Sequence, residues 1–142
     1  TVASTGAILS SITDFNAAAT SADTLNVTAA VAAISITAVD VTGVVTGDTG
    51  TLTAATDASG ILTLTGLAAD IAAVDTIAEW VAVALLTSSD GIANVLAFEY
   101  DGDTYVYEDA AANTELLTVE LTGVTGITAV ATAAGATTIL IA

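Results

Sequence analysis

Residues 95–108, VLAFEYDGDTYVYE, place two short aromatic-bearing runs on either side of an Asp-Gly dipeptide. Asp-Gly between alternating apolar residues is a strong signal for a β-hairpin with a two-residue turn. In that register Phe98 faces Tyr105, and Leu96 faces Tyr107, on one side of the hairpin. The stretch therefore predicts an antiparallel strand pair that carries most of the aromatic side chains of the chain.

The same alternation of β-branched and small residues between Gly, Asp and Ser breaks runs outward from this hairpin in both directions. Such runs are typical of strands. We expect ten of them, at residues 8–15, 24–27, 34–41, 51–55, 61–65, 95–100, 104–108, 116–121, 127–131 and 137–141. The pattern predicts a mainly β fold, an antiparallel β-sandwich or β-roll-like domain, with residues 1–142 as a single domain.

One segment departs from the strand pattern. Between residues 70 and 86, Ile71, Val74, Ile77, Val81 and Leu85 recur at spacings of three and four, which predicts one amphipathic α-helix. We expect an aspartate at position 70 to cap this helix and the Ser-Ser-Asp-Gly run at 88–91 to end it. The single tryptophan lies near the apolar stripe and is expected to anchor a core or an interface.

The composition excludes many functions. The 142 residues include 16 Asp and Glu but no Lys, Arg, His, Cys, Met or Pro, and the net charge is −16. Because 54% of the residues are hydrophobic, the chain is expected to fold in spite of this charge. Without basic side chains it cannot neutralise phosphates, so we expect no nucleic-acid partner. Divalent cations and basic protein surfaces are the electrostatic partners that remain.

The segment 121–142 contains no charged residue and is long enough to be compared with a membrane span. Six threonines and three glycines interrupt it, and it has no basic or aromatic anchors, so we assign it to strands and expect no membrane insertion. The amino-terminal residues contain no basic region of a signal peptide. A chain that begins at Thr1 is therefore expected to be a processed product or a fragment.

Carboxylates are concentrated at the hairpin. Asp101, Asp103 and Asp109 lie within nine residues of one another, next to two glutamates at positions 99 and 108. Carboxylate oxygens are the ligands that Ca²⁺ prefers, so these three aspartates are the candidate metal ligands. The alternative is a solvated acidic turn, which needs no metal. The spacing does not match an EF-hand loop.

Most enzyme classes are excluded by the missing side chains. Catalytic Ser-His-Asp, Cys-His and Ser-Lys groups, Schiff bases and His-ligated zinc all require residues that the chain lacks. Paired carboxylates remain available, and Asp48-Thr49-Gly50 matches the core of the aspartic protease signature, which would act in a dimer. Asp-Thr-Gly is also an ordinary turn sequence, and the residue after the glycine is Thr51 where that family has Ala or Ser.

Three segments carry a resemblance to a known family. ITDFNAAATSADTLNV at 12–27, FEYDGDTYVYED at 98–109 and LTVELTGVTGITAV at 117–130 resemble, in this order, motifs in the carboxyl-terminal tails of bacterial type I-secreted proteins of the RTX and surface-layer kind. The resemblance implies export in an unfolded state and folding outside the cell with calcium and self-association. The glycine-rich calcium repeats of the family are missing, and Asn26 stands where the entry segment usually has Asp. Among calcium ligands, only Asp101, Asp103 and Asp109 can be carried over.

Two hypotheses follow. The first is a non-enzymatic, extracellular structural protein that self-assembles into a filament or surface layer, with cation assistance, through strand edges near both ends of the chain. The second is a secretion and capping module that a type I exporter reads and that covers a larger exported partner. A dimeric aspartic protease acting through Asp48 is a third, weaker reading. The first hypothesis is favoured because strand runs such as 121–142 lack the edge charges that normally block strand addition.

Overall fold

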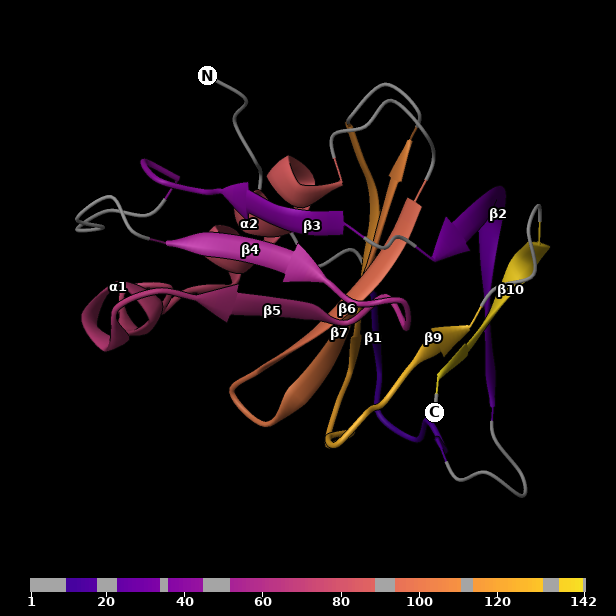
Figure 1. Cartoon of the computed structure of the whole chain (residues 1–142). Helices are drawn as coiled ribbons and strands as arrows, with labels where there is room; N and C mark the ends of the chain where they lie inside the picture. The colour runs from indigo at the N-terminus through magenta and orange to yellow at the C-terminus, as the bar shows by residue number, and fades with distance from the viewer. Residues whose placement is uncertain are drawn as a thin grey trace.

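The computed structural model describes residues 10–17, 23–33, 36–44, 52–88, 94–110, 114–131 and 136–141. Within these ranges the protein is mainly β, with a seven-stranded sheet, a three-stranded sheet and two helices (Figure 1). The predicted mainly β class is therefore confirmed, and each of the ten expected strands overlaps an observed one. Asp48-Thr49-Gly50 lies outside the described residues, as do residues 1–9 and 89–91.

The larger sheet has the strand order β1-β8-β7-β6-β2-β10-β9. Its strands are β1 (Ser10–Ile12), β2 (Thr24–Ala33), β6 (Asn94–Tyr100), β7 (Asp103–Ala110), β8 (Thr114–Leu121), β9 (Val130–Ala131) and β10 (Ala136–Ile141). Most neighbours are antiparallel, as predicted, but β1 pairs with β8 and β2 pairs with β6 in parallel. The sheet is therefore mixed, because segments far apart in the sequence add to the two sides of the central β6-β7-β8 meander.

The central hairpin has the predicted register. Leu96 pairs with Tyr107 and Phe98 pairs with Tyr105, and the strands are joined by a two-residue turn. The two turn residues, Asp101 and Gly102, have φ values of 52° and 87°. Positive φ at both positions is the geometry of a type I′ turn, which matches the twist of the flanking strands.

The smaller sheet is an antiparallel meander of β3 (Ile36–Asp40), β4 (Thr53–Thr56) and β5 (Leu62–Thr65). The turn between β4 and β5 contacts the larger sheet directly. The N–H of Ala97 in β6 donates to the carbonyl of Gly60 at 2.9 Å, and Ile61 forms a parallel bridge with Ala97. The N–H of Val130 in β9 also donates to the carbonyl of Ser59 in this turn at 2.7 Å, so the turn is bonded to both β6 and β9 of the larger sheet.

The predicted helix over 70–86 is two helices, α1 (Ala68–Ala72) and α2 (Ile77–Thr87). The side chain of Thr76 accepts from the N–H of Glu79, and the Glu79 carboxylate accepts from the N–H of Thr76, which forms a capping box at the start of α2. This box begins a new helix where the apolar spacing predicted a continuous one. Asp70 was expected to cap the helix, but Leu67 is the N-cap of α1 and Asp70 is buried in its first turn. The predicted end near residue 88 is confirmed.

Two apolar clusters lie on opposite faces of the larger sheet, because side chains alternate along β6 and β7. The first joins Leu96, Phe98, Tyr105 and Tyr107 to residues of α2 and the smaller sheet. Figure 1 shows the smaller sheet and the helices gathered on one side of the β6-β7-β8 meander. The second cluster contains Leu25, Val95, Ala97, Val106, Val119, Leu121, Val124 and Val130.

Three rings form the centre of the first cluster. Phe98 is fully buried between Trp80 and Tyr105, with ring centroids 5.2 Å and 5.4 Å apart and an angle of 11° between planes in both pairs. The stack connects α2 to both strands of the central hairpin. The expectation that Trp80 anchors a core is confirmed.

In the described part of the chain, neither helix has the length and apolar character needed to cross a bilayer.

Candidate functional site

The three predicted metal ligands do not come together. Asp101 and Asp103 lie at the tip of the β6-β7 hairpin, whereas Asp109 lies near the other end of β7. Asp109 lies six residue steps along the strand from Asp103, a span of roughly 20 Å. Among the described residues, no group of three or more carboxylates is placed to hold a metal ion. Calcium binding at the hairpin tip stays a prediction, without Asp109 as a member of the same ligand set.

Asp109 has a structural contact instead. It is fully buried, and its Oδ1 accepts a hydrogen bond from the N–H of Asn94 at 2.7 Å. Asp70 and Glu108 are also buried, at 1% exposure each. Because the sequence contains no basic side chain, no Lys, Arg or His can pair with these acids, and their hydrogen-bond donors are uncharged groups.

The acids near the hairpin tip hold the segment that follows β8. Oδ1 of Asp103 accepts from the N–H of Gly123 at 2.6 Å. Oε1 of Glu99 accepts from the N–H groups of Gly126 and Ile127 at 2.5 Å and 3.1 Å. Two carboxylates of one hairpin therefore accept hydrogen bonds from three backbone N–H groups of the segment that follows β8.

The segment 121–127, LTGVTGI, is built for this contact. Gly123 and Gly126 both have φ of 74°, a left-handed conformation that glycine adopts without strain. Between them, the hydroxyl of Thr104 donates to the carbonyl of Val124 at 2.7 Å. The repeated Thr-Gly dipeptide was the sequence signal for this arrangement, although sequence reasoning did not connect it to the hairpin acids.

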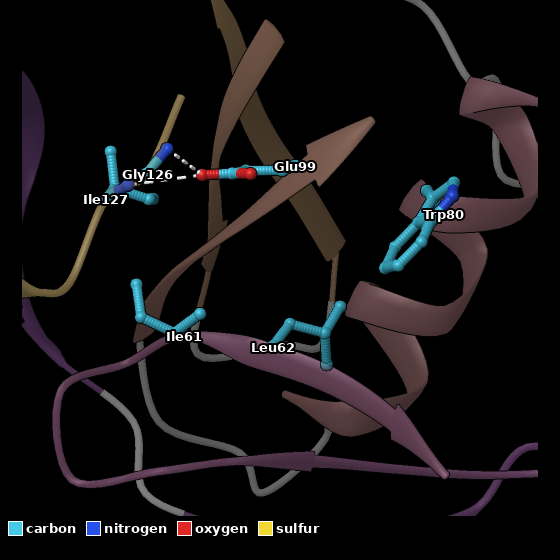
Figure 2. A pocket seen from close by; sticks show the side chains of 6 residues that line it. All are labelled: Ile61, Leu62, Trp80, Glu99, Gly126 and Ile127. Carbon is cyan, nitrogen blue, oxygen red and sulfur yellow. Dashed lines mark hydrogen bonds between the residues drawn. The ribbon is translucent and has the colours of Figure 1, made fainter. Parts of the chain in front are cut away.

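A pocket of about 400 Å³ lies beside this segment. Its lining residues come from four parts of the chain, namely Ile61, Leu62, Trp80, Glu99, Gly126 and Ile127. Figure 2 shows Glu99 reaching toward Gly126 and Ile127 on one side, with Trp80 on the opposite side and Ile61 and Leu62 between them. The walls are apolar, and Glu99 supplies the one ionisable side chain of the lining.

The pocket lies at the edge of β6 where regular strand pairing ends. The Ala97 N–H points away from β7, toward Gly60. Backbone groups alternate along a strand, so the N–H and C=O of Glu99 face the same edge as those of Ala97. Glu99 is exposed and Leu62 is buried, so the pocket runs from solvent toward the first apolar cluster.

The lining of the pocket combines one carboxylate with apolar side chains and backbone groups. Its lining contains no hydroxyl, thiol, amine or imidazole group that could act as a nucleophile or as a base near neutral pH. One carboxylate, held by two N–H groups, offers a fixed negative charge next to apolar surface. Such a combination recognises a ligand by charge and shape.

Tyr105 stands at the inner end of the ring stack, with its hydroxyl 3.3 Å from Oε1 of Glu120. Burial raises the pKa of Tyr105 to about 12, and the negative charge of Glu120 acts in the same direction. The phenol therefore stays protonated well above the pH at which an exposed tyrosine ionises, and it serves as a hydrogen-bond donor.

Comparison with known proteins gave no relatives. No protein-family model, curated protein or solved structure matches the chain.

Proposed function

We propose that this chain is a non-enzymatic, extracellular structural protein that assembles into filaments or layers through the open edges of its sheets, with cation assistance. The observation that carries the proposal is the edge strand β3. In the described part of the chain β3 pairs only with β4, which leaves a five-residue strand with one unpaired side. An unpaired edge is a template for strand addition from a second copy.

The edge lacks the usual protection against such pairing. Natural edge strands are commonly blocked by lysine, by proline or by inward-pointing charges. The sequence contains no lysine or proline, and Asp40 at the end of β3 is the strand's one charged residue. Hydrogen bonds from the side chain and the N–H of Thr42 hold the pKa of Asp40 below its usual value. This carboxylate is ionised at neutral pH, so each copy brings a negative charge to the pairing of two β3 edges, and a cation or high salt would reduce the repulsion.

The expected pairing surfaces near the chain ends need correction. The carboxyl-terminal strand β10 lies inside the larger sheet, between β2 and β9, and does not form its edge. The outermost strands, β1 and β9, contain only three and two residues. Short edges of this kind offer few hydrogen bonds, which is why β3 is the better candidate.

Electron microscopy and light scattering at several calcium and salt concentrations test assembly. We expect filaments or sheets with Ca²⁺ or at high ionic strength, and dispersal by EDTA at low salt, because screening reduces the repulsion among 16 carboxylates. Assemblies that persist unchanged in EDTA and low salt would contradict cation assistance. Monomers under every condition would replace assembly with the secretion and capping module as the preferred function.

Two matched variants test the edge. Ala38 is exposed on β3, and Ala78 is exposed on α2. Ala38→Glu and Ala78→Glu add the same side chain and the same charge, but only the first places it on the proposed pairing strand. We expect Ala38→Glu to abolish assembly and Ala78→Glu to retain it. Equal assembly of both variants would exclude the β3 edge.

A further inference from the structure

We propose that the pocket formed by Ile61, Leu62, Trp80, Glu99, Gly126 and Ile127 binds an organic cation, in which an ammonium group is joined to an apolar alkyl or aromatic body. The proposal is independent of assembly, because none of these residues belongs to β3. It assigns a ligand class to a cavity that combines a negative charge with apolar walls.

The charge is fixed in position before a ligand arrives. Two N–H groups, from Gly126 and Ile127, bind Oε1 of Glu99, and this restrains the carboxylate at one side of the pocket. Both of these hydrogen bonds go to Oε1, so Oε2 retains its capacity to accept a hydrogen bond from a ligand. A restrained carboxylate loses less conformational entropy on binding than a freely rotating one.

The shape of the pocket sets the rest of the ligand. A volume of about 400 Å³ lies in the range of small-molecule sites. Ile61, Leu62 and Trp80 face Glu99 across this space with apolar surface, and Figure 2 shows the indole nitrogen of Trp80 turned away from Glu99. A ligand that fills the pocket therefore meets negative charge at one end and hydrocarbon at the other. The carbonyl of Glu99, which faces the same edge of β6, is a second acceptor for an ammonium group.

Charge complementarity points to a cation from another molecule. The net charge is −16, and no Lys, Arg or His side chain exists in the chain to occupy the site. A side chain of a second copy cannot supply the ammonium group for the same reason. The source is either a free small amine or a lysine side chain of a different, basic protein, and both present the same ammonium group on an alkyl stem.

The fluorescence of Trp80 reports ligand binding in the pocket, because Trp80 lines the pocket and is the only tryptophan in the chain. Titration of the full chain compares phenethylammonium with its neutral isostere 2-phenylethanol and with the anion 3-phenylpropanoate. We expect the ammonium to bind at least about tenfold more tightly than the alcohol, because a hydrogen bond between charged groups is stronger than one to a neutral hydroxyl. Equal binding of amine and alcohol, or no response of Trp80 to any of the three, would overturn the proposal.

Variants test the contributions of the Glu99 carboxylate and of the apolar lining to binding. Glu99→Gln keeps an oxygen acceptor for Gly126 and Ile127 and removes the charge. The ratio of the affinity for the amine to the affinity for the alcohol should therefore fall to about one. Asp14→Asn removes one exposed carboxylate that does not line the pocket, and should leave the preference unchanged. Equal loss in both variants would show a general effect of net charge and overturn the assignment. Ile127→Ala should weaken binding of amine and alcohol alike.

The amine and alcohol titrations of the unmodified chain decide the question even if a variant fails to fold. A separate titration distinguishes a free small amine from a lysine side chain of a basic protein. Nα-acetyl-lysine amide carries the lysine side chain without the aromatic body. Binding of this compound at least as tightly as phenethylammonium favours a basic protein partner, and tighter binding of phenethylammonium favours a free amine. Failure of both compounds to bind overturns the proposal.

Discussion

The carboxylate of Asp103 and the backbone N–H of Gly123 lie 2.6 Å apart, and this contact ties the tip of the β6-β7 hairpin to the turn after β8. The aspartate was predicted as a calcium ligand on the basis of its neighbours in sequence. The structure gives its Oδ1 a hydrogen-bond partner within the chain, the N–H of Gly123.

Replacing Asp103 tests this contact. We expect Asp103→Ala to lower the free energy of unfolding by about 1 kcal/mol, because the N–H of Gly123 loses a charged acceptor at a partly exposed site. Asp101→Asn, at the exposed turn, should have a smaller effect, since asparagine tolerates positive φ. Urea unfolding followed by Trp80 fluorescence measures both. Equal losses in the two variants would contradict a specific role for the Asp103 contact.

The capping box of α2 gives a second expectation. Thr76→Ala removes the acceptor for the N–H of Glu79 and should cost about 1 kcal/mol of folding stability. Thr125→Ala removes the same atoms at an exposed position in the segment after β8 and should be near neutral. Thermal unfolding by circular dichroism distinguishes them. A Thr76→Ala variant as stable as Thr125→Ala would show that packing alone starts α2.

The ring stack predicts a large loss from a single substitution. Phe98→Ala leaves a cavity between Trp80 and Tyr105 and should cost about 3–5 kcal/mol. Leu67 is 57% exposed, so Leu67→Ala should change stability by less than about 0.5 kcal/mol. Chemical denaturation measures the difference. Similar effects of the two changes would place the folding core elsewhere.

Tyr105 predicts a fall in stability at high pH. Its pKa is raised from 10.0 to about 12 in the folded protein, so above pH 10 the unfolded chain loses this proton more readily than the folded one. The unfolded state is then favoured, and stability should fall progressively between pH 10 and pH 12. Below pH 10 this contribution is fully present. Tyr105→Phe removes the ionisation, so the variant should lose less stability across this interval than the unmodified chain. If the free energy of unfolding falls equally with pH in the two proteins, the raised pKa of Tyr105 is contradicted.

Local signals in the sequence predicted the local structure well. The Asp-Gly turn and the alternation of 95–108 fixed both the hairpin and its register, because a two-residue turn allows one pairing of the strands. The apolar spacing of 70–86 located the helical region but not its interruption. The side-chain hydrogen bonds of Thr76 and Glu79 begin α2 within a pattern that remains helical throughout.

Long-range relationships could not be predicted in the same way. No local pattern indicates that β1 adds to β8 in parallel, or that Ile61 bridges to Ala97. The pocket depends on those relationships, since its lining comes from β5 and its preceding turn, α2, β6 and the segment after β8. The role of Glu99 depends on the fold of a turn 27 residues away. Sequence proximity grouped Asp101, Asp103 and Asp109, but the extended strand places Asp109 near the other end of β7 from the hairpin tip.

The parallel pairing of β1 with β8 has a consequence for the order in which the chain folds. Ser10 pairs with Val119, so more than a hundred residues separate the two partners. The β6-β7-β8 meander closes short loops and can form early, whereas the β1 contact requires the ends of a very long loop to meet. A chain delivered from its amino terminus therefore keeps β1 without its partner until residues 119–121 of β8 have emerged.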